Sequence, residues 1–290
     1  LLTSALNVYV DNNEKMSNIK EYIKSQGIEI KGIKFGKSKA QYFMDKDENA
    51  IYQGISSIKY CNDQIADELY ELSKNHYDNF VDLLSDIISK TSVDDRQLHI
   101  LTTLNFFSEF GKNKYLLSII DMYNLLGKCK TLKKDKIASL NIREEDVRKC
   151  AEKETPKQYS NVDKDKLVKL MISGLENKPL SIKEQIVYEQ EYLGNIMYKN
   201  PKAPKDMYYV LECKFYKDKS KPYLMLYNMR DGEYLKTKIT SGKSFIESPF
   251  IAGNVINVKE FGEKNKMKKV GGDWIKTDEK ERIVKKWDVY

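Results

Sequence analysis

A proline-containing stretch at residues 200–204 (NPKAP) separates two kinds of hydrophobic pattern. Helices rarely continue through the residue before a proline, so two prolines this close together mark a boundary. Upstream of the stretch, apolar residues recur at the three- and four-residue spacing of amphipathic helices. From Met207 onward they alternate with polar residues, as in strands that bury one face. We therefore expect an α+β chain in which a mainly helical part precedes a β-rich part.

The first 48 residues mix helix and strand patterns. A helical stripe is expected to end at Gly27, which would be the first residue after the helix. Residues 28–30 and 41–44 are short runs with β propensity. Residues 1–48 are thus interpreted as a small α/β segment. Because Leu1 is not Met and already lies in an amphipathic pattern, we expect the chain to be a fragment of a longer polypeptide.

Residues 49–127 carry several short helical patterns with tight connections between them. One helix is expected to be capped by Asp94 or Asp95 and to end near Gly111, because acidic residues favour the first position of a helix and glycine its end. Short helices with tight connections are typical of a compact helical domain.

Residues 128–180 are highly charged and weakly periodic, and we interpret residues 128–204 as a charged connector with some helix. One helix in this region is predicted clearly, over residues 181–194. Ser181 and Glu184 have the spacing of a capping box, in which each side chain bonds the other's backbone N–H.

Five short strands are predicted within residues 205–290. The first covers residues 207–216, and Asp231-Gly232 is a hairpin signal before the third. Residues 250–260 form a later strand broken by Gly253, and residues 264–270 and 274–275 are candidates for later strands. Five strands with one longer excursion, at residues 241–249, are typical of a small Greek-key barrel such as an OB-fold.

The excess positive charge lies in the last third of the chain. The formal net charge is +7. Residues 201–290 contain 20 Lys+Arg and 13 Asp+Glu, so the first 200 residues, with 30 of each, sum to zero. Such a surplus is expected where a protein meets a polyanion. A lysine-rich proteome is the alternative explanation, because Lys, Asn, Ile and Tyr are abundant throughout.

Alternation in the predicted strands gathers basic and aromatic side chains on one face of the sheet. In the first strand, Tyr208, Val210 and Glu212 are expected on that same face. Lysines attract phosphates and tyrosine rings stack on unpaired bases, so the face is predicted to bind single-stranded nucleic acid. An ordinary solvated face is the alternative. The predicted binding residues are Lys214, Tyr216, Tyr234, Lys236 and Lys238.

The sequence contains no convincing catalytic set. Asp45, Asp47 and Glu48 lie close together, but a charged turn explains them better than a site for two metal ions. No Walker loop, nucleophile elbow or HExxH motif occurs. No catalytic residue and no metal ligand is therefore predicted.

The cysteine pattern and the hydropathy indicate the cellular compartment in which the protein is expected. The cysteines form no CxxC pair, so a structural zinc site is not expected and a reducing cytoplasm fits best. No apolar run approaches the length of a membrane span, so no membrane partner is expected. The four cysteines are Cys61, Cys129, Cys150 and Cys213.

Five segments, in order along the chain, resemble one known family. Residues 27–30 (GIEI) are similar to its G-I-x-V strand and residues 51–59 (IYQGISSIK) to its I-x-x-G-L-x-x-I-K segment. Residues 80–84 (FVDLL) resemble its F-x-x-L-x-D-F helix. Residues 104–111 (LNFFSEFG) resemble K-A-G-A-F-D-x-L-G, and residues 189–198 (EQEYLGNIMY) resemble W-E-K-E-x-L-G-x-Y-L. Together they resemble the C-terminal region of bacterial or phage C-family replicative polymerases, the DNA polymerase III alpha subunits.

The resemblance implies a domain order. Residues 1–48 would be the end of the polymerase fingers, and 49–127 a helix-hairpin-helix-type helical domain. Residues 128–204 would be the charged connector, and 205–290 an OB-fold β-barrel. The catalytic carboxylates and their Mg²⁺ ions would lie upstream of Leu1, so no cofactor is expected in this chain, and alone it should be inactive.

One departure from the family pattern concerns the hairpin that follows Ile58. The family has Gly-x-Gly there, and its backbone amides meet a phosphate, whereas this chain has Tyr60, Cys61 and Asn62. Without glycines a close backbone approach is disfavoured, so duplex binding by this hairpin is expected to be weakened or lost. Lys59 and Asn62 are the best remaining candidates for contacts with nucleic acid.

The expected function is DNA binding within a DNA-directed DNA polymerase that takes part in DNA replication, a nucleotidyltransferase whose active site lies elsewhere. The chain would hold duplex product and single-stranded template. A sliding clamp and other replisome proteins are partners that the resemblance implies, although residues 121–123, which faintly resemble a clamp peptide, are interpreted as core packing. The alternatives are a standalone single-stranded-DNA-binding or adaptor module, and a barrel that binds protein.

Overall fold

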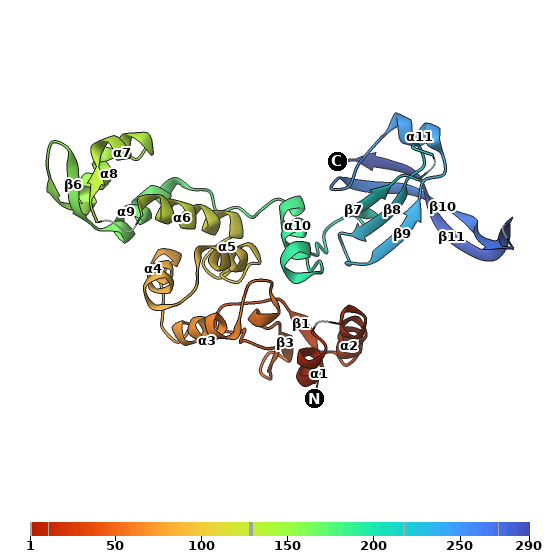
Figure 1. The fold of residues 1–290 in the computed structure, drawn as a ribbon, viewed down its shortest axis with the longest axis horizontal. Helices are drawn as coiled ribbons and strands as arrows, with labels where there is room; N and C mark the ends of the chain where they lie inside the picture. Colours follow the sequence, from red (N-terminus) through yellow and green to blue (C-terminus); the bar gives the residue numbers. More distant parts are fainter. Residues whose placement is uncertain (1, 11, 128–129, 217, 272) are drawn as a thin grey trace. The chain divides into compact units, whose positions relative to one another are not determined.

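The chain divides into two units at Asn195. The computed structural model describes residues 2–10, 12–127, 130–216, 218–271 and 273–290. Contacts within the chain define unit 1, Leu1–Asn195, and unit 2, Ile196–Tyr290. The division falls just before the proline-containing stretch at which the sequence pattern changes. Figure 1 shows both units, with labels on many of their helices and strands.

Two helices and a three-stranded sheet form the N-terminal part of unit 1, where Figure 1 labels α1, α2, β1 and β3. The elements are α1 (Leu2–Val8), α2 (Asn13–Ser25), β1 (Glu29–Lys31), β2 (Phe43–Asp45) and β3 (Ala50–Tyr52). Strand β3 pairs in parallel with β1 and antiparallel with β2. Leu6, Ile23 and Ile51 bury the helices against the sheet. Because β3 belongs to this sheet, the α/β segment continues past residue 48, where the sequence analysis ended it.

The end of α2 matches its prediction. Gln26 is the C-cap, and Gly27 follows it with a φ of 71°. This left-handed conformation carries no steric cost for glycine, which has no Cβ. The glycine therefore allows the chain to turn from α2 into β1.

Four helices and one 3₁₀ turn form the next part of unit 1. The elements are η1 (Ile55–Ser57), α3 (Asp63–Leu72), α4 (Phe80–Lys90), α5 (Asp95–Thr103) and α6 (Asn113–Leu126). Asn62, Asn79 and Asp94 cap α3, α4 and α5, because each side chain accepts a hydrogen bond from a backbone N–H in the first turn. Of the two aspartates proposed as caps, Asp94 takes that position and Asp95 is the first helical residue.

Helix α5 ends at Thr103, earlier than the predicted end near Gly111. Asn105 adopts a left-handed φ of 64°, which breaks the helix, and the following residues form turns. These turns place aromatic rings in the core beside rings from other segments. The ring cluster, which lies at edge-to-face and tilted angles, consists of Phe35, Phe80, Phe106, Phe107 and Phe110.

Residues 130–174 contain a sheet as well as helices, where the sequence analysis expected a connector with some helix. The elements are β4 (Leu132–Lys133), α7 (Lys134–Ser139), α8 (Glu144–Cys150), β5 (Ala151–Glu154), β6 (Gln158–Val162), α9 (Lys164–Met171) and η2 (Ile172–Gly174). The strands form a sheet of order β4-β6-β5. Ile137, Val147 and Leu167 join the same hydrophobic core as helices α3 to α6.

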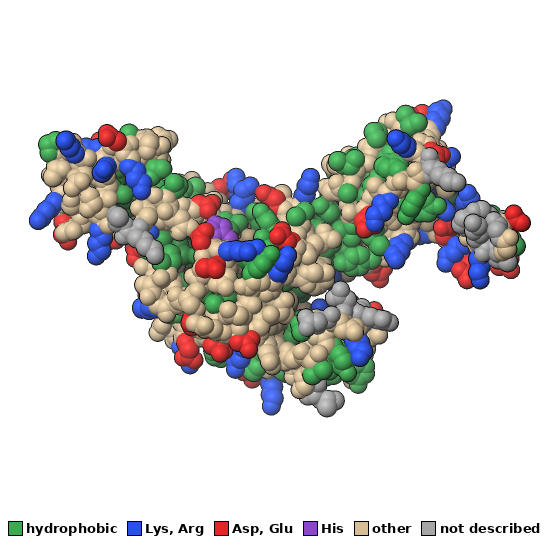
Figure 2. All heavy atoms as spheres, viewed as in Figure 1, with side chains coloured by type: hydrophobic (Ala, Val, Ile, Leu, Met, Phe, Trp, Pro, Cys, Tyr) green, Lys and Arg blue, Asp and Glu red, His purple; other side chains and the backbone are tan. Residues whose placement is uncertain are grey.

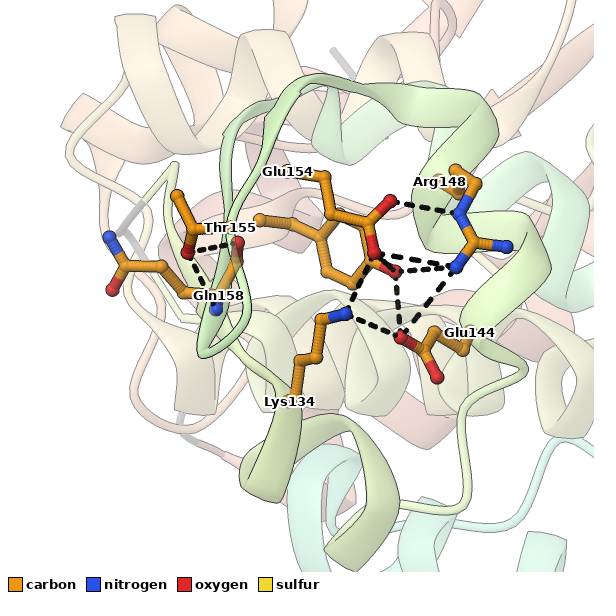
Figure 3. Close-up of polar contacts among 7 residues, drawn as sticks. Lys134, Glu144, Arg148, Glu154, Thr155 and Gln158 are labelled. Carbon is orange, nitrogen blue, oxygen red and sulfur yellow. Dashed lines mark hydrogen bonds and ion pairs between the residues drawn. The ribbon is translucent and has the colours of Figure 1, made fainter.

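An ionic network holds the β5–β6 hairpin against α7 and α8 (Figure 3). The hydroxyl of the fully buried Tyr159 lies 2.7 Å from Glu144 and 2.9 Å from Glu154. Lys134 and Arg148 pair with Glu154 at 2.7 and 3.0 Å. Hydrogen bonds from Arg148, Lys134 and Tyr159 lower the pKa of Glu154 to about 2. Since opposite charges pair throughout this cluster, we interpret it as structural rather than catalytic.

Helix α10 (Ile182–Leu193) is anchored to α6 by buried amides. Ser181 and Glu184 form the predicted capping box, and Gly194 ends the helix with a left-handed φ of 69°. The side-chain amide of Asn113 donates to Oε1 of Gln185 at 2.7 Å, and both residues are buried. This contact fixes the position of α10 within unit 1.

Unit 2 contains a five-stranded sheet, whose strands are labelled in Figure 1. The elements are β7 (Met207–Lys214), β8 (Tyr223–Asn228), β9 (Tyr234–Lys238), α11 (Gly242–Glu247), β10 (Val255–Val270) and β11 (Asp273–Val289). The order is β11-β10-β7-β8-β9, and neighbouring strands are antiparallel. Residues 250–254, predicted as strand, form a turn before β10, and the predicted strands over the rest of 250–260 and at 264–270 and 274–275 are one long hairpin, β10–β11.

The sheet of unit 2 curls toward a barrel. Its two outer strands, β9 and β11, approach each other at a parallel bridge between Ile239 and Val284. No longer ladder joins these strands in the part of the chain that the structure describes, so the OB-like sheet is not closed. Tyr208, Leu226 and Ile256 belong to the core inside it.

No helix among the described residues is long and apolar enough to cross a lipid bilayer. Nor do the described His, Cys, Asp and Glu side chains include a group of three that could hold a metal ion. Cys61, Cys150 and Cys213 are free thiols, and Cys129 lies outside the described residues.

Candidate nucleic-acid interface

A tight turn at residues 58–62 joins η1 to α3. The Cys61 N–H donates to the Ile58 carbonyl at 3.0 Å, and the Asn62 side chain accepts from the Ile65 N–H at 3.0 Å. Between them Tyr60 has a φ of 72°. A left-handed conformation costs a residue with a side chain about 1 kcal/mol or more. The left-handed turn thus forms without glycine, because the buried Ile58 and the cap of α3 fix its two ends.

Two cations from different elements lie near the exposed ring of Tyr60. The guanidinium carbon of Arg96, in the first turn of α5, is 3.3 Å from the ring centroid, and the Lys59 ammonium is 5.0 Å away. The neighbouring Gln97 amide donates to the Tyr60 carbonyl at 3.0 Å, which ties α5 to the turn. A hydrogen bond from Lys59 and the charge of Arg96 lower the pKa of Tyr60. The turn therefore presents two positive charges beside an aromatic ring that is 42% exposed.

Of the two residues predicted in this turn, Lys59 and Asn62 have different surroundings. Lys59 is exposed, so its ammonium is available to an anion. Asn62 uses its side-chain oxygen to cap α3. Arg96 was not predicted, although the structure places it closer to the Tyr60 ring than Lys59. The contact of Lys59 and Asn62 with nucleic acid stays a prediction.

A β-bulge in unit 2 changes which residues of β7 share a face. The register with β8 shifts between Val210 and Glu212. Tyr208 and Val210 consequently point into the core, while Glu212 and Lys214 point outward. The prediction that all four lie on one face was wrong, because one extra residue in a strand reverses the alternation beyond it. Lys214 keeps its predicted outward position.

The predicted residues of β9 do lie together on the outer face. Tyr234, Lys236 and Lys238 alternate with the inward residues Leu235, Thr237 and Ile239. Opposite them on β8, Tyr223 pairs with Lys238 and Met225 pairs with Lys236. Directly paired residues on one face of a sheet have their Cβ atoms about 5 Å apart. The outer face of β8 and β9 therefore carries a row of basic, aromatic and apolar side chains.

Tyr223 extends this face toward the β7–β8 loop, a position that the sequence analysis did not single out. It pairs with Lys214 across β7 and β8. Its ring contacts Tyr216 edge to face at 5.1 Å. Tyr216 is 69% exposed, so a flat aromatic surface is open to solvent at this end. The structure thus brings Lys214, Tyr216, Tyr223 and Lys238 together.

Carboxylates offset part of the positive charge on this face. Lys214 pairs with Glu212 at 2.6 Å and Lys238 with Glu281 at 2.5 Å. Lys236 forms no ion pair with any residue that the structure describes. In Figure 2, blue and red side chains are interspersed over the visible surface, so charge alone does not mark a patch. The arrangement of rings and lysines is what distinguishes the β8–β9 face.

The acidic turn of the N-terminal sheet has a structural role. Glu48 pairs with Lys31 at 2.8 Å and with Lys37 at 2.9 Å. Hydrogen bonds from Lys31, Tyr52 and Lys37 lower the pKa of Glu48 to about 2. Asp45 pairs with Lys37 as well. Their pairing with lysines agrees with the interpretation as a charged turn.

Comparison with protein families gives a match within unit 1. The helix-hairpin-helix motif matches residues 27–117, which is less than half of the chain and includes the turn at 58–62. No curated protein matches the chain. The match indicates a DNA-binding domain in unit 1.

Proposed function

We propose that the chain is the DNA-holding C-terminal region of a C-family replicative DNA polymerase whose active site lies upstream. The observation that carries this proposal is the helix-hairpin-helix match at residues 27–117. It falls on the segment where the resemblance to DNA polymerase III alpha subunits implies such a domain. An OB-like sheet follows it in the chain, in the order that the resemblance implies.

In unit 1 the turn at 58–62 would hold the phosphate backbone. The N–H groups of Tyr60 and Asn62 donate to no acceptor within the described residues, and both lie beside the N-terminus of α3. Free amides and the positive end of a helix attract phosphate groups. Lys59 and Arg96 add charge at the same place. Contacts of this kind set the position of DNA without reading its sequence.

In unit 2 the strand order supports an OB-fold. Five antiparallel strands, a helix between the third and fourth, and a bridge between the third and fifth are arranged as a partly open barrel. OB-folds bind oligonucleotides on the face of their second and third strands and in the adjoining loops. Those strands are β8 and β9 here, and they carry Tyr223, Tyr234 and Lys236. We assign single-stranded template to this face.

In this proposal the upstream domain would hold Mg²⁺ and form the phosphodiester bond. The residues of this chain would bind phosphates and stack bases, which positions DNA for that reaction. Sliding clamp and other replisome proteins remain proposed partners on the strength of the resemblance alone.

Fluorescence anisotropy with three labelled DNAs tests the proposal. The full chain should bind a primer–template junction more tightly than a blunt duplex or oligo-dT, because only the junction offers both surfaces their ligand. Affinity should fall steeply between about 50 and about 200 mM salt, as phosphate contacts require. Absence of binding to all three DNAs at low salt would overturn the proposal.

Two further measurements separate the proposal from its alternatives. The double variant Lys236→Glu, Lys238→Glu should weaken oligo-dT binding and leave the blunt duplex bound. Binding to oligo-dT without any affinity for duplex would favour the standalone single-strand module instead. An upstream open reading frame that encodes a P-D-x-D-x-D segment would favour the polymerase, and a start codon directly before Leu1 would contradict it.

A further inference from the structure

Helix α10 brings two more tyrosines to the turn at 58–62. The Tyr192 carbonyl accepts a hydrogen bond from the Lys59 N–H at 3.1 Å. The rings of Tyr188 and Tyr192, one helical turn apart, are nearly parallel, with centroids 6.0 Å apart and planes at 7°. Both tyrosines are partly exposed. Burial and the charge of Glu191 raise the pKa of Tyr192, and the nearby charge of Arg96 opposes this shift.

Arg96 is held in a way that leaves it free to bind an anion. It forms no ion pair with any described residue, and its guanidinium lies on the Tyr60 ring. The N–H groups of a guanidinium point outward in its plane, so stacking on a ring leaves them available for phosphate. A cation in the first turn of a helix is disfavoured by the helix dipole. The stability of α5 therefore gives no reason for an arginine at this position.

Asp95, next to Arg96, pairs with His99 at 3.4 Å, and the exposed Glu191 lies next to Tyr192 in the chain. Two other carboxylates close in sequence to the cluster also have other partners. Asp94 accepts a hydrogen bond from the Gln97 N–H at 2.7 Å as the cap of α5. Asp63 bonds the Ser56 hydroxyl. Neither pairs with Lys59 or Arg96, so the two positive charges remain uncompensated by these groups.

We propose that unit 1 contains a second single-stranded DNA site, in which bases stack on Tyr60, Tyr192 and Tyr188 while Arg96 and Lys59 hold the phosphates. We call these five residues the tyrosine strip. The site rests on the proposed DNA-binding function but lies partly outside the helix-hairpin-helix match, since α10 begins at Ile182. To the phosphate contact proposed for the turn it adds stacking on side chains, which every base can make.

Oligo-dT binding by the full chain tests the strip. The Lys236→Glu, Lys238→Glu variant serves as the background, because it weakens the competing face of unit 2. Tyr192→Leu and Tyr188→Leu should each weaken binding by about five- to hundredfold, the usual cost of losing a stacked base. Arg96→Gln should weaken binding about fivefold near 0.1 M salt and reduce the salt slope by about 0.7, as expected for one lost phosphate contact.

Matched variants distinguish loss of the site from loss of the fold. Tyr192→Phe keeps the ring and should bind like the background protein. Tyr22→Leu and Lys24→Gln alter exposed side chains on α2 and should bind like it too. If the Leu variants bind as well as the background protein, or if Tyr192→Phe loses as much affinity as Tyr192→Leu, the strip is wrong. Failure of the unmodified chain to bind any DNA would instead reject the proposed function.

Discussion

Substitutions of Asn62 separate its role as a helix cap from a role in DNA binding. The side-chain oxygen of Asn62 accepts the Ile65 N–H at 3.0 Å, and Asn62→Ala removes this bond. Loss of an N-cap of this kind costs about 1 kcal/mol. With a urea m value of about 2 kcal/mol/M, the unfolding midpoint of unit 1 should fall by about 0.5 M. Asn62→Asp keeps the cap and places a negative charge where the helix dipole favours it, so stability should be kept or slightly raised.

The same aspartate should weaken DNA binding. Two charges about 4 Å apart in water interact by about 1 kcal/mol, so a carboxylate beside a phosphate should raise the Kd about fivefold. Circular dichroism in urea measures the first effect and fluorescence anisotropy with a primer–template measures the second. Asn79→Ala is the control, because Asn79 caps α4 in the same way and should cost similar stability without changing DNA affinity. An unchanged midpoint for Asn62→Ala would refute the capping argument, and full DNA affinity of Asn62→Asp would remove the turn from the interface.

Three further predictions concern titration, thiol reactivity and packing. Burial alone would lower the pKa of His99, but hydrogen bonds to a backbone carbonyl and to Asp121 raise it above 6.5. A raised folded-state pKa stabilises unit 1 below the unfolded pKa, and this contribution is lost as pH rises through the folded value. The stability advantage of the wild type over His99→Gln should therefore shrink from about pH 6 to about pH 8 in urea titrations, and a constant advantage would contradict this. Burial raises the pKa of Cys61 to about 12, so iodoacetamide at about pH 8 should label it slowly in native protein and rapidly in urea, as followed by peptide mass mapping. Equal labelling rates in native protein and in urea would show that the turn opens and exposes Cys61, which would contradict this prediction. Phe107→Ala should cost about 3–5 kcal/mol in chemical denaturation because the ring is fully buried, whereas the exposed Leu125→Ala should cost less than about 1 kcal/mol, and equal losses would refute the assignment of the core.

Features that depend on a few neighbouring residues were predictable from the sequence. The capping box of Ser181 and Glu184 and the left-handed Gly27 involve contacts within one helix end, so local residue types determine them. The fold of residues 130–180 was missed because Leu132, Ile137, Ile142 and Val147 are spaced by five residues. That spacing matches neither the helical nor the strand period, so a periodicity argument finds only charge there.

The candidate site, too, was predictable only where neighbouring residues in the sequence determine the structure. Alternation placed the outward residues of β9 correctly, because that strand is regular. It failed in β7, where the bulge after Val210 has no marker in the residue types. Arg96 was missed for a different reason: it reaches the ring of Tyr60 from another helix, and a contact between elements depends on their packing. The lack of glycine at the turn and the cation Lys59 were visible in the sequence, whereas the packing of Arg96 on the Tyr60 ring was not.

Photocrosslinking tests most directly whether both units hold DNA. The full chain would be irradiated with oligonucleotides that contain 5-iodouracil, first as a single strand and then as the template overhang of a primer–template. Peptide mass mapping should find crosslinks in unit 1 at Tyr60, Tyr188 or Tyr192 and in unit 2 at Tyr216, Tyr223 or Tyr234. Crosslinks that occur only at tyrosines outside these two surfaces would contradict the assignment of both.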